Sequence, residues 1–342
     1  MLDIPTHVLV ALSFNIQTRG IMNQDRRIGS TRRFLLSIAV IICAFAKAQT
    51  PNPTINTLAY NYEPQALDGK TAGLQVALSL RKLFVDYDGP LVRLRRASDN
   101  AQKDFYPAAV SGILDTPSIL EWAEGSNVFC VTWYDQFGNR DATAPGVAQQ
   151  PQMNLMEIDR PALAPDGTFN ANGDRLIIQN ANTGQLIGSL GQTTIIQTIR
   201  ATERSQFNWG VFISNAVRYT GHVNWNNNRL YWDPGTCCGG TRSASNTANE
   251  NKWQVYTYRR SNPGRSVRAG TNTPRLLFSQ AGYNPGAPAA SIRNAAWFLF
   301  GANGTNTHSN SQVTEFIMYN TSLSDVLVQE LEDSAIRDWK LN

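Results

Sequence analysis

The stretch VFCVTWYDQFGN, residues 128–139, contains a candidate strand and a candidate turn in direct succession. Residues 128–134 are rich in β-branched and aromatic side chains, which favour strands. Asp135, Gly138 and Asn139 follow them and are residue types that commonly form turns. A dense apolar strand that ends in a short polar turn is typical of antiparallel β proteins.

The same succession of short strand and turn continues along the chain. The predicted strands are residues 91–96, 175–179, 193–200, 209–214, 229–232, 253–259, 266–269, 297–300 and 313–319. Apolar residues at helical spacing predict helices over 71–87, 112–125 and 322–341. We therefore predict an all-β antiparallel sandwich or jelly roll with short peripheral helices and a C-terminal helix.

The N-terminal region has the features of a secretory signal peptide. Arg32 and Arg33 precede an apolar run over residues 34–45, and an Ala-x-Ala cleavage pattern follows. The apolar run is too short for a membrane span, and Met22 is a plausible start. We expect residues 1–48 to be a signal peptide with an upstream extension, 49–70 an extended leader, and 71–342 one sandwich domain. The mature chain would be secreted or held at the cell surface, without a membrane span.

The charge of the predicted mature chain excludes one class of partner. The full sequence has 30 Lys and Arg against 26 Asp and Glu, but residues 1–48 hold six of the former and two of the latter. The remainder therefore carries 24 of each and is neutral. Without a basic run, nothing predicts nucleic-acid binding. His222 and His308 show no metal-ligand spacing with cysteine, so we expect no metal and no cofactor.

Two adjacent cysteines, Cys237 and Cys238, lie in a Gly- and Pro-rich turn after an aromatic strand end. Neighbouring cysteines are too close for ordinary disulfide geometry. If bonded, they form a strained ring that closes almost no loop but presents a stiff, flat surface to a ligand. Two free thiols, or half-cystines bonded elsewhere, are the alternatives. The simplest partition of the mature cysteines is a Cys237–Cys238 bond with Cys130 buried and free.

Three segments resemble the catalytic domain of α-L-arabinofuranosidase B. They are AGLQVALSLRKLFVDYDGPLVRLRR at 72–96, VTWYDQFGNRDAT at 131–143 and QQPQM at 149–153, followed in matching order by Cys237-Cys238 and by GYNP at 282–285. Residues 315–325 also resemble the C-terminal part of concanavalin A-like and laminin-G-like domains. The resemblance implies a concanavalin A-like β-sandwich in which the adjacent cysteines form a disulfide that lines a sugar pocket.

The sequence departs from that family at the positions that carry its chemistry. A retaining glycosidase needs two carboxyl groups, one as nucleophile and one as acid/base. The family's acid lies in a Gly-Gly-Asp-Asn turn, and the matching turn here contains Asn303. The segment between Cys238 and Gly282 is short and has Glu250 as its only carboxylate. Glu250 and Glu315 are weak catalytic candidates, since Glu250 has a loop-like context and we expect Glu315 to face solvent.

Three functions therefore compete. The first is a secreted carbohydrate-binding or adhesion protein that binds a polysaccharide or glycan. The second is an active α-L-arabinofuranosidase that acts on arabinose-containing polysaccharide, and the third is a structural surface protein without a sugar site. The first predicts a site formed by Trp232, Asp233, Cys237, Cys238 and Asn303. The alternative to sugar binding is packing in the hydrophobic core, and it applies to Trp209, Trp225 and Trp232.

Overall fold

The computed structural model describes residues 65–157, 160–165, 173–179, 186–201, 207–235, 237, 241–246, 250–302 and 308–341. The predicted signal peptide, the leader up to residue 64, Cys238 and Asn303 lie outside these described residues. Residues 65–70, predicted to belong to the extended leader, form turns instead, and Leu67 is fully buried.

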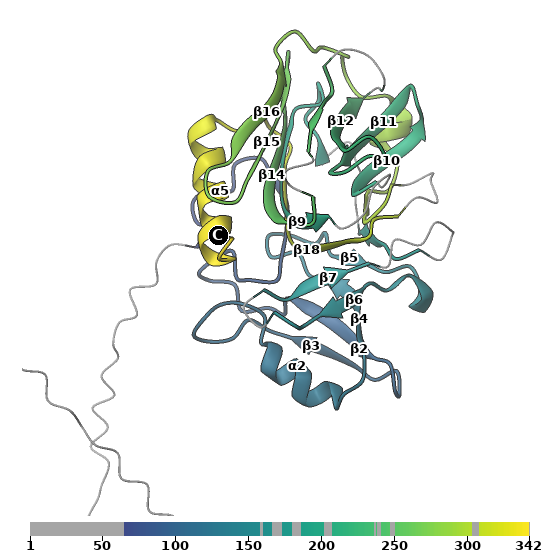
Figure 1. Ribbon diagram of the computed structural model, residues 1–342, viewed down its shortest axis with the longest axis vertical. Coiled ribbons are helices and arrows are strands. Elements are labelled where there is room, and N and C mark those ends of the chain that lie inside the picture. The colour runs from purple at the N-terminus through teal and green to yellow at the C-terminus, as the bar shows by residue number, and fades with distance from the viewer. Residues whose placement is uncertain are drawn as a thin grey trace, which may run out of the picture. The chain divides into compact units, whose positions relative to one another are not determined.

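Antiparallel pairing joins 18 strands into one continuous, curved sheet (Figure 1). One series of neighbours runs through the long strands that cross the molecule. These are β1 (Leu74–Ser79), β18 (Ser311–Tyr319), β9 (Thr193–Ala201), β14 (Trp253–Arg260), β15 (Arg265–Gly270) and β16 (Arg275–Gln280).

The second series begins with a group of strands that carries the candidate site. It contains β13 (Ser243–Ser245), β12 (Arg229–Gly235), β11 (Val217–His222), β10 (Trp209–Ser214) and β17 (Phe298–Leu299). It continues through β8 (Leu176–Ile178), β5 (Ala142–Thr143), β4 (Val128–Trp133), β2 (Val92–Arg96) and β3 (Gln102–Phe105). Strands β6 (Gln152–Asn154) and β7 (Ala162–Ala164) join β4 to β18.

The two series pack against each other through large aromatic side chains. Trp209 on β10 has its ring centroid 5.1 Å from that of Tyr258 on β14, and Trp232 on β12 lies 5.7 Å from Tyr258. Trp297 stacks on Trp209 at 5.8 Å. These rings are fully buried, so the two series form the faces of a β-sandwich with an aromatic core.

Helices are short except at the C-terminal end. α2 (Thr116–Ala123) begins where the Asp115 carboxylate accepts a hydrogen bond from the Ser118 amide, with a proline in its first turn. α5 (Asp325–Asp338) is capped in the same way by Ser324. Both helices confirm the sequence prediction. The remaining short elements are η1 (Val147–Gln149) and α4 (Ala290–Arg293). Among the described residues no helix is long and apolar enough to cross a membrane.

The helix predicted over residues 71–87 is wrong, because its first half is strand β1. Five of the six side chains of β1 are buried, so both faces of the strand are covered. A strand buried on both faces has no period-two pattern, so its apolar run resembled a buried helix. Seven further strands were not predicted, namely β3, β5, β6, β7, β11, β13 and β16. Strands β5, β6, β7 and β13 are only two or three residues long, and β3, β11 and β16 carry many polar side chains.

Two predictions about polar side chains had different outcomes. Asp135 accepts hydrogen bonds from the backbone amides of Ala77, Phe137, Gly138 and Arg140, which confirms its predicted role in shaping the turn. Arg93 and Arg95 lie two positions apart in the predicted strand 91–96 and therefore share one face, and from the sequence alone that face is predicted to be solvated. Arg93 is exposed and pairs with Asp104, whereas Arg95 is buried and donates to Gln150.

Candidate functional site

Strands β11 and β12 carry the side chains that surround Cys237. Successive residues of a strand point to opposite faces, so Tyr231 and Asp233 share one face while Trp232 points to the other. Across the pair, Thr220 lies opposite Asp233 and His222 opposite Tyr231. Arg218, Thr220 and His222 of β11 therefore lie on the same face as Tyr231 and Asp233.

This face contains a cavity of about 190 Å³, which we call the β11–β12 pocket. Its walls combine polar, aromatic and cysteine side chains, namely Asn215, Arg218, His222, Trp225, Tyr231, Cys237 and Arg242. Cys237, Trp225 and Tyr231 are half-buried, and Asn215 is exposed. The predicted location of a site beside Cys237 thus coincides with a cavity.

Asp233 binds both arginines of the pocket wall without reaching the pocket itself. Its Oδ2 accepts from Arg218 Nη2 at 2.5 Å and from Arg242 Nη1 at 2.6 Å. Asp233 is 0% exposed. A carboxylate in so dry a position needs compensating cations, and here two guanidiniums supply them. The pocket wall consequently holds two fixed cations against one buried carboxylate.

Burial acts on the guanidinium of Arg218. It lowers the pKa of Arg218, and the neighbouring Arg242 lowers it further, while Asp233 opposes the shift. Arg218 Nε is buried and has no hydrogen-bond partner among the described residues. Two guanidiniums bound to one carboxylate leave a net positive charge in the pocket wall.

His222 forms the inner wall together with aromatic rings. Its Nε2 lies 3.2 Å from the Thr220 hydroxyl and 3.9 Å from Asp233 Oδ2. Its ring centroid is 4.4 Å from that of Phe207 and 4.9 Å from that of Trp225. The contact with Trp225 is edge-on, and the guanidinium of Arg242 lies 4.3 Å from the centroid of Tyr231. Arg242 thus covers Tyr231, and the contacts of Trp225 with the rings of His222 and Phe207 are both T-shaped.

The chain that leads from β12 to Cys237 is anchored at its start. The Pro234 carbonyl accepts from Arg260 Nη1 at 2.9 Å and from the Tyr283 hydroxyl at 3.1 Å. Tyr283 belongs to the GYNP segment, which therefore supports the site from behind. Gly235 follows with a φ of 125°, a conformation that favours glycine. The Cys237 amide then donates to the Asn215 carbonyl at 3.1 Å.

The structure corrects two of the predicted sugar-binding residues. Trp232 is 0% exposed and packs in the aromatic core at 5.2 Å from Trp209, so its core alternative holds. Asp233 is equally buried, so both side chains support the pocket without facing a ligand. Cys238 and Asn303 lie outside the described residues, and their roles stay predictions.

Among the described cysteines, Cys130 is free and buried, as predicted. Burial raises the pKa of its thiol. The pairing of Cys237 with Cys238 stays a prediction, since Cys238 lies outside the described residues.

The expectation that Glu315 faces solvent is wrong. Its side chain is 1% exposed and binds Arg81, the Ser79 hydroxyl and the Trp339 indole. The other candidate, Glu250, lies in the turn before β14 and does not line the β11–β12 pocket. Among the described residues, no Asp or Glu lines this pocket. No group of three His, Cys, Asp or Glu that could hold a metal occurs in the described part of the chain.

Sequence reasoning missed several pocket residues. Arg218 and His222 lie on β11, which was not predicted, and Arg242 lies in a loop. Asn215 lies in the turn between β10 and β11. The signal that could have identified one of them is the alternation of side chains along β12. If Trp232 points into the core, Tyr231 points to the opposite face, which carries the β11–β12 pocket.

Comparison with known proteins identifies the fold. No family model matches the chain, and no curated protein matches it. Among solved structures, an arabinofuranosidase complexed with arabinofuranosyl-α-1,2-xylobiose has a TM-score of 0.61 at 14% identity, over 80% of this chain and 64% of that one. A GH54 α-L-arabinofuranosidase soaked with a cyclic sulfate inhibitor has a TM-score of 0.58 at 16% identity, with the same coverage. The chain spans about 64% of the length of these enzymes and has their concanavalin A-like β-sandwich fold.

Proposed function

We propose that the protein is a secreted or cell-surface carbohydrate-binding protein that uses the β11–β12 pocket and does not hydrolyse its ligand. The observation that carries this proposal is the composition of the pocket wall. An indole, an amide and two guanidiniums surround the cavity beside Cys237, and none of the described wall residues is a carboxylate.

These groups suit a sugar. An aromatic ring packs on the apolar CH face of a sugar ring, and Trp225, a half-buried indole of the pocket wall, is the residue to which we assign that contact. The Asn215 amide can donate and accept hydrogen bonds, and Arg242 can donate them. A sugar hydroxyl therefore finds a partner whether it acts as donor or as acceptor. Of the solved enzymes with this fold, one is complexed with arabinofuranosyl-α-1,2-xylobiose and one is soaked with 4-nitrophenyl α-L-arabinofuranoside. An arabinose-containing glycan is therefore the first ligand to test.

Hydrolysis requires more than this wall provides. A retaining glycosidase places two carboxyl groups about 5 Å apart around the scissile bond. Asp233 is the nearest identified carboxylate, and it is buried behind Arg218 and Arg242. General acid catalysis contributes on the order of a hundred- to ten-thousandfold in rate, so loss of the donor and the nucleophile together removes nearly all activity.

The test combines a glycan array with calorimetric titration of the mature chain by the arabinose-containing oligosaccharides that bind to the array. We expect binding that Trp225→Ala and Arg242→Gln weaken. The matched control is Tyr106→Ala, an aromatic residue that is 50% exposed and does not line the pocket. Failure to bind any glycan would favour the structural surface protein.

Active arabinofuranosidase is the second candidate, since the fold is that of such enzymes. Its test is hydrolysis of 4-nitrophenyl α-L-arabinofuranoside by the same protein preparation. Turnover that is lost on Glu250→Gln would establish the enzyme and overturn the binding proposal.

A further inference from the structure

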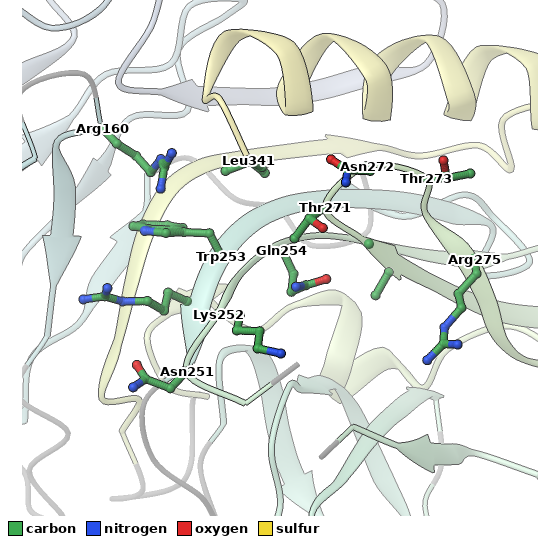
Figure 2. A pocket seen from close by; sticks show the side chains of 13 residues that line it. Arg160, Asn251, Lys252, Trp253, Gln254, Thr271, Asn272, Thr273, Arg275 and Leu341 are labelled. Carbon is green, nitrogen blue, oxygen red and sulfur yellow. The ribbon is translucent and has the colours of Figure 1, made fainter. Parts of the chain in front are cut away.

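A second cavity lies at the Trp253 end of β14, and it shares no residue with the β11–β12 pocket. Its volume is about 630 Å³. Figure 2 shows Lys252 and Gln254 on one side of this hollow and Arg275 on the other, with Asn272 and Thr273 at the turn between β15 and β16. We call this cavity the basic pocket.

Positive charge dominates the basic pocket. Arg160, Arg200, Lys252 and Arg275 line it, and none of the described lining residues is Asp or Glu. Glu157 provides partial compensation, because its carboxylate lies 3.3 Å from Arg160 Nη1 and 3.6 Å from Arg200 Nη1. The side chain of Arg275 is exposed and makes no ion pair or hydrogen bond with the described residues.

Two of the cations are held in place before any ligand arrives. The guanidinium carbons of Arg160 and Arg200 lie 5.6 and 5.8 Å from the ring centroid of Trp253, which is 7% exposed. Arg160 also donates to the Trp339 carbonyl at 2.8 Å and to the Lys340 carbonyl at 2.7 Å. Arg200 Nε is buried with no hydrogen-bond partner among the described residues. Cation–π contacts and hydrogen bonds thus position two guanidiniums, which reduces the entropy lost on binding.

We propose that the basic pocket binds an acidic polysaccharide, through its uronate carboxylates or sulfate esters. Guanidinium and ammonium groups bind such anions directly. The hydroxyl groups of the polysaccharide between those charges can form hydrogen bonds with further lining side chains. These are the amides of Asn251, Gln254 and Asn272 and the hydroxyls of Thr271 and Thr273.

Other anions fit this site less well. The cavity has the size of sites for ligands larger than an inorganic ion. Single-stranded nucleic acid stacks its bases on exposed aromatic rings, and Trp253 is buried beneath its arginines. This inference does not depend on the proposed function, because the two pockets are formed by different residues.

The experiment measures binding of the mature chain to polygalacturonate, dextran sulfate and neutral dextran by affinity electrophoresis and calorimetry. We expect binding to at least one of the two acidic polymers and none to neutral dextran. Whichever of polygalacturonate and dextran sulfate binds more tightly identifies carboxylate or sulfate as the preferred anionic group. Binding should weaken as the salt concentration rises, since these charges are partly exposed.

The variant Lys252→Gln/Arg275→Gln tests the location of the site, and Lys103→Gln/Arg293→Gln is its control. Both variants remove two positive charges, and the control removes them from exposed side chains outside the basic pocket. We expect the first variant to lose about fivefold or more in affinity and the control less than about twofold. Both variants keep Arg160 and Arg200, whose contacts support the fold.

Equal losses in the two variants would overturn the proposal, because they would show attraction by net charge alone. Equal binding of neutral dextran, or single-stranded DNA binding as tight as that of the acidic polymers, would overturn it as well. The Trp225→Ala variant separates the two sites: it should reduce arabinoside affinity at the β11–β12 pocket about fivefold while leaving acidic polymer binding unchanged.

Discussion

The guanidinium of Arg81, two residues after the end of β1, binds the carboxylate of Glu315 on β18, with Nε 2.8 Å from Oε2 and Nη2 3.2 Å from Oε1. The two side chains are 3% and 1% exposed, and Arg81 also binds Asp338 of α5. Burial by itself lowers the pKa of Arg81, but the charges of Glu315 and Asp338 raise it overall. The pair therefore connects the centre of the sandwich to its C-terminal helix.

We expect Glu315→Ala to destabilise the protein by about 3–5 kcal/mol, because it leaves the Arg81 charge buried without its main partner. Urea unfolding followed by tryptophan fluorescence measures this loss. The folded fraction should keep full affinity for glycans, since Glu315 lies outside both pockets. Unchanged stability with loss of a hydrolytic activity would instead assign Glu315 to catalysis.

Trp225 and Trp232 should respond to substitution in opposite ways. Trp232→Ala empties part of the aromatic core and should cost about 3–5 kcal/mol of stability. Trp225→Ala removes an indole from the pocket wall and should reduce glycan affinity about fivefold with little effect on stability. Thermal unfolding and calorimetric titration of both variants separate the two effects. A Trp232→Ala protein that is stable but cannot bind would contradict the core position.

Asp141 should make stability depend on pH in the acidic range. Burial raises the pKa of Asp141 above 3.8, the negative charge of Asp135 adds to the shift, and the hydrogen bond from the Asp135 amide opposes it. A carboxyl with a raised folded-state pKa stabilises the fold while protonated, and that contribution is lost as the pH rises above its ordinary value. Asp141→Asn should therefore gain stability relative to the wild type between pH 3 and 7. Parallel urea curves across this range measure the difference, and a constant difference would refute the prediction.

The cysteines can be counted by chemical labelling. The Cys130 thiol is buried and its pKa is raised, so a maleimide should not modify it in the native protein. In denaturant without reductant, we expect one label per mature chain, on Cys130, because the predicted bond between Cys237 and Cys238 would protect both of their sulfur atoms. After reduction all three cysteines should be labelled. A peptide cross-linked from Cys130 to either of the others would disprove this pairing.

Local sequence was sufficient for much of the fold. The strands at 128–133, 193–201 and 311–319 are rich in β-branched and aromatic residues, and their turns use Asp, Asn and Gly in ordinary roles. The Ser324 cap and the helix that follows it are likewise local features. The adjacent cysteines indicated the position of a pocket, because they lie in a turn directly after a strand that ends in aromatic residues.

Tertiary structure decided which side chains form the site. Strand β1 resembled a helix because both its faces are buried, and β11 went unnoticed because one of its faces is polar. Glu315 is neutralised by Arg81, which lies 234 positions away in the chain. Asp233 similarly depends on Arg218 of the neighbouring strand. Periodicity reports which face of an element is apolar, but the partner of a buried charge is set by how distant segments pack, and that is decided only by the folded chain.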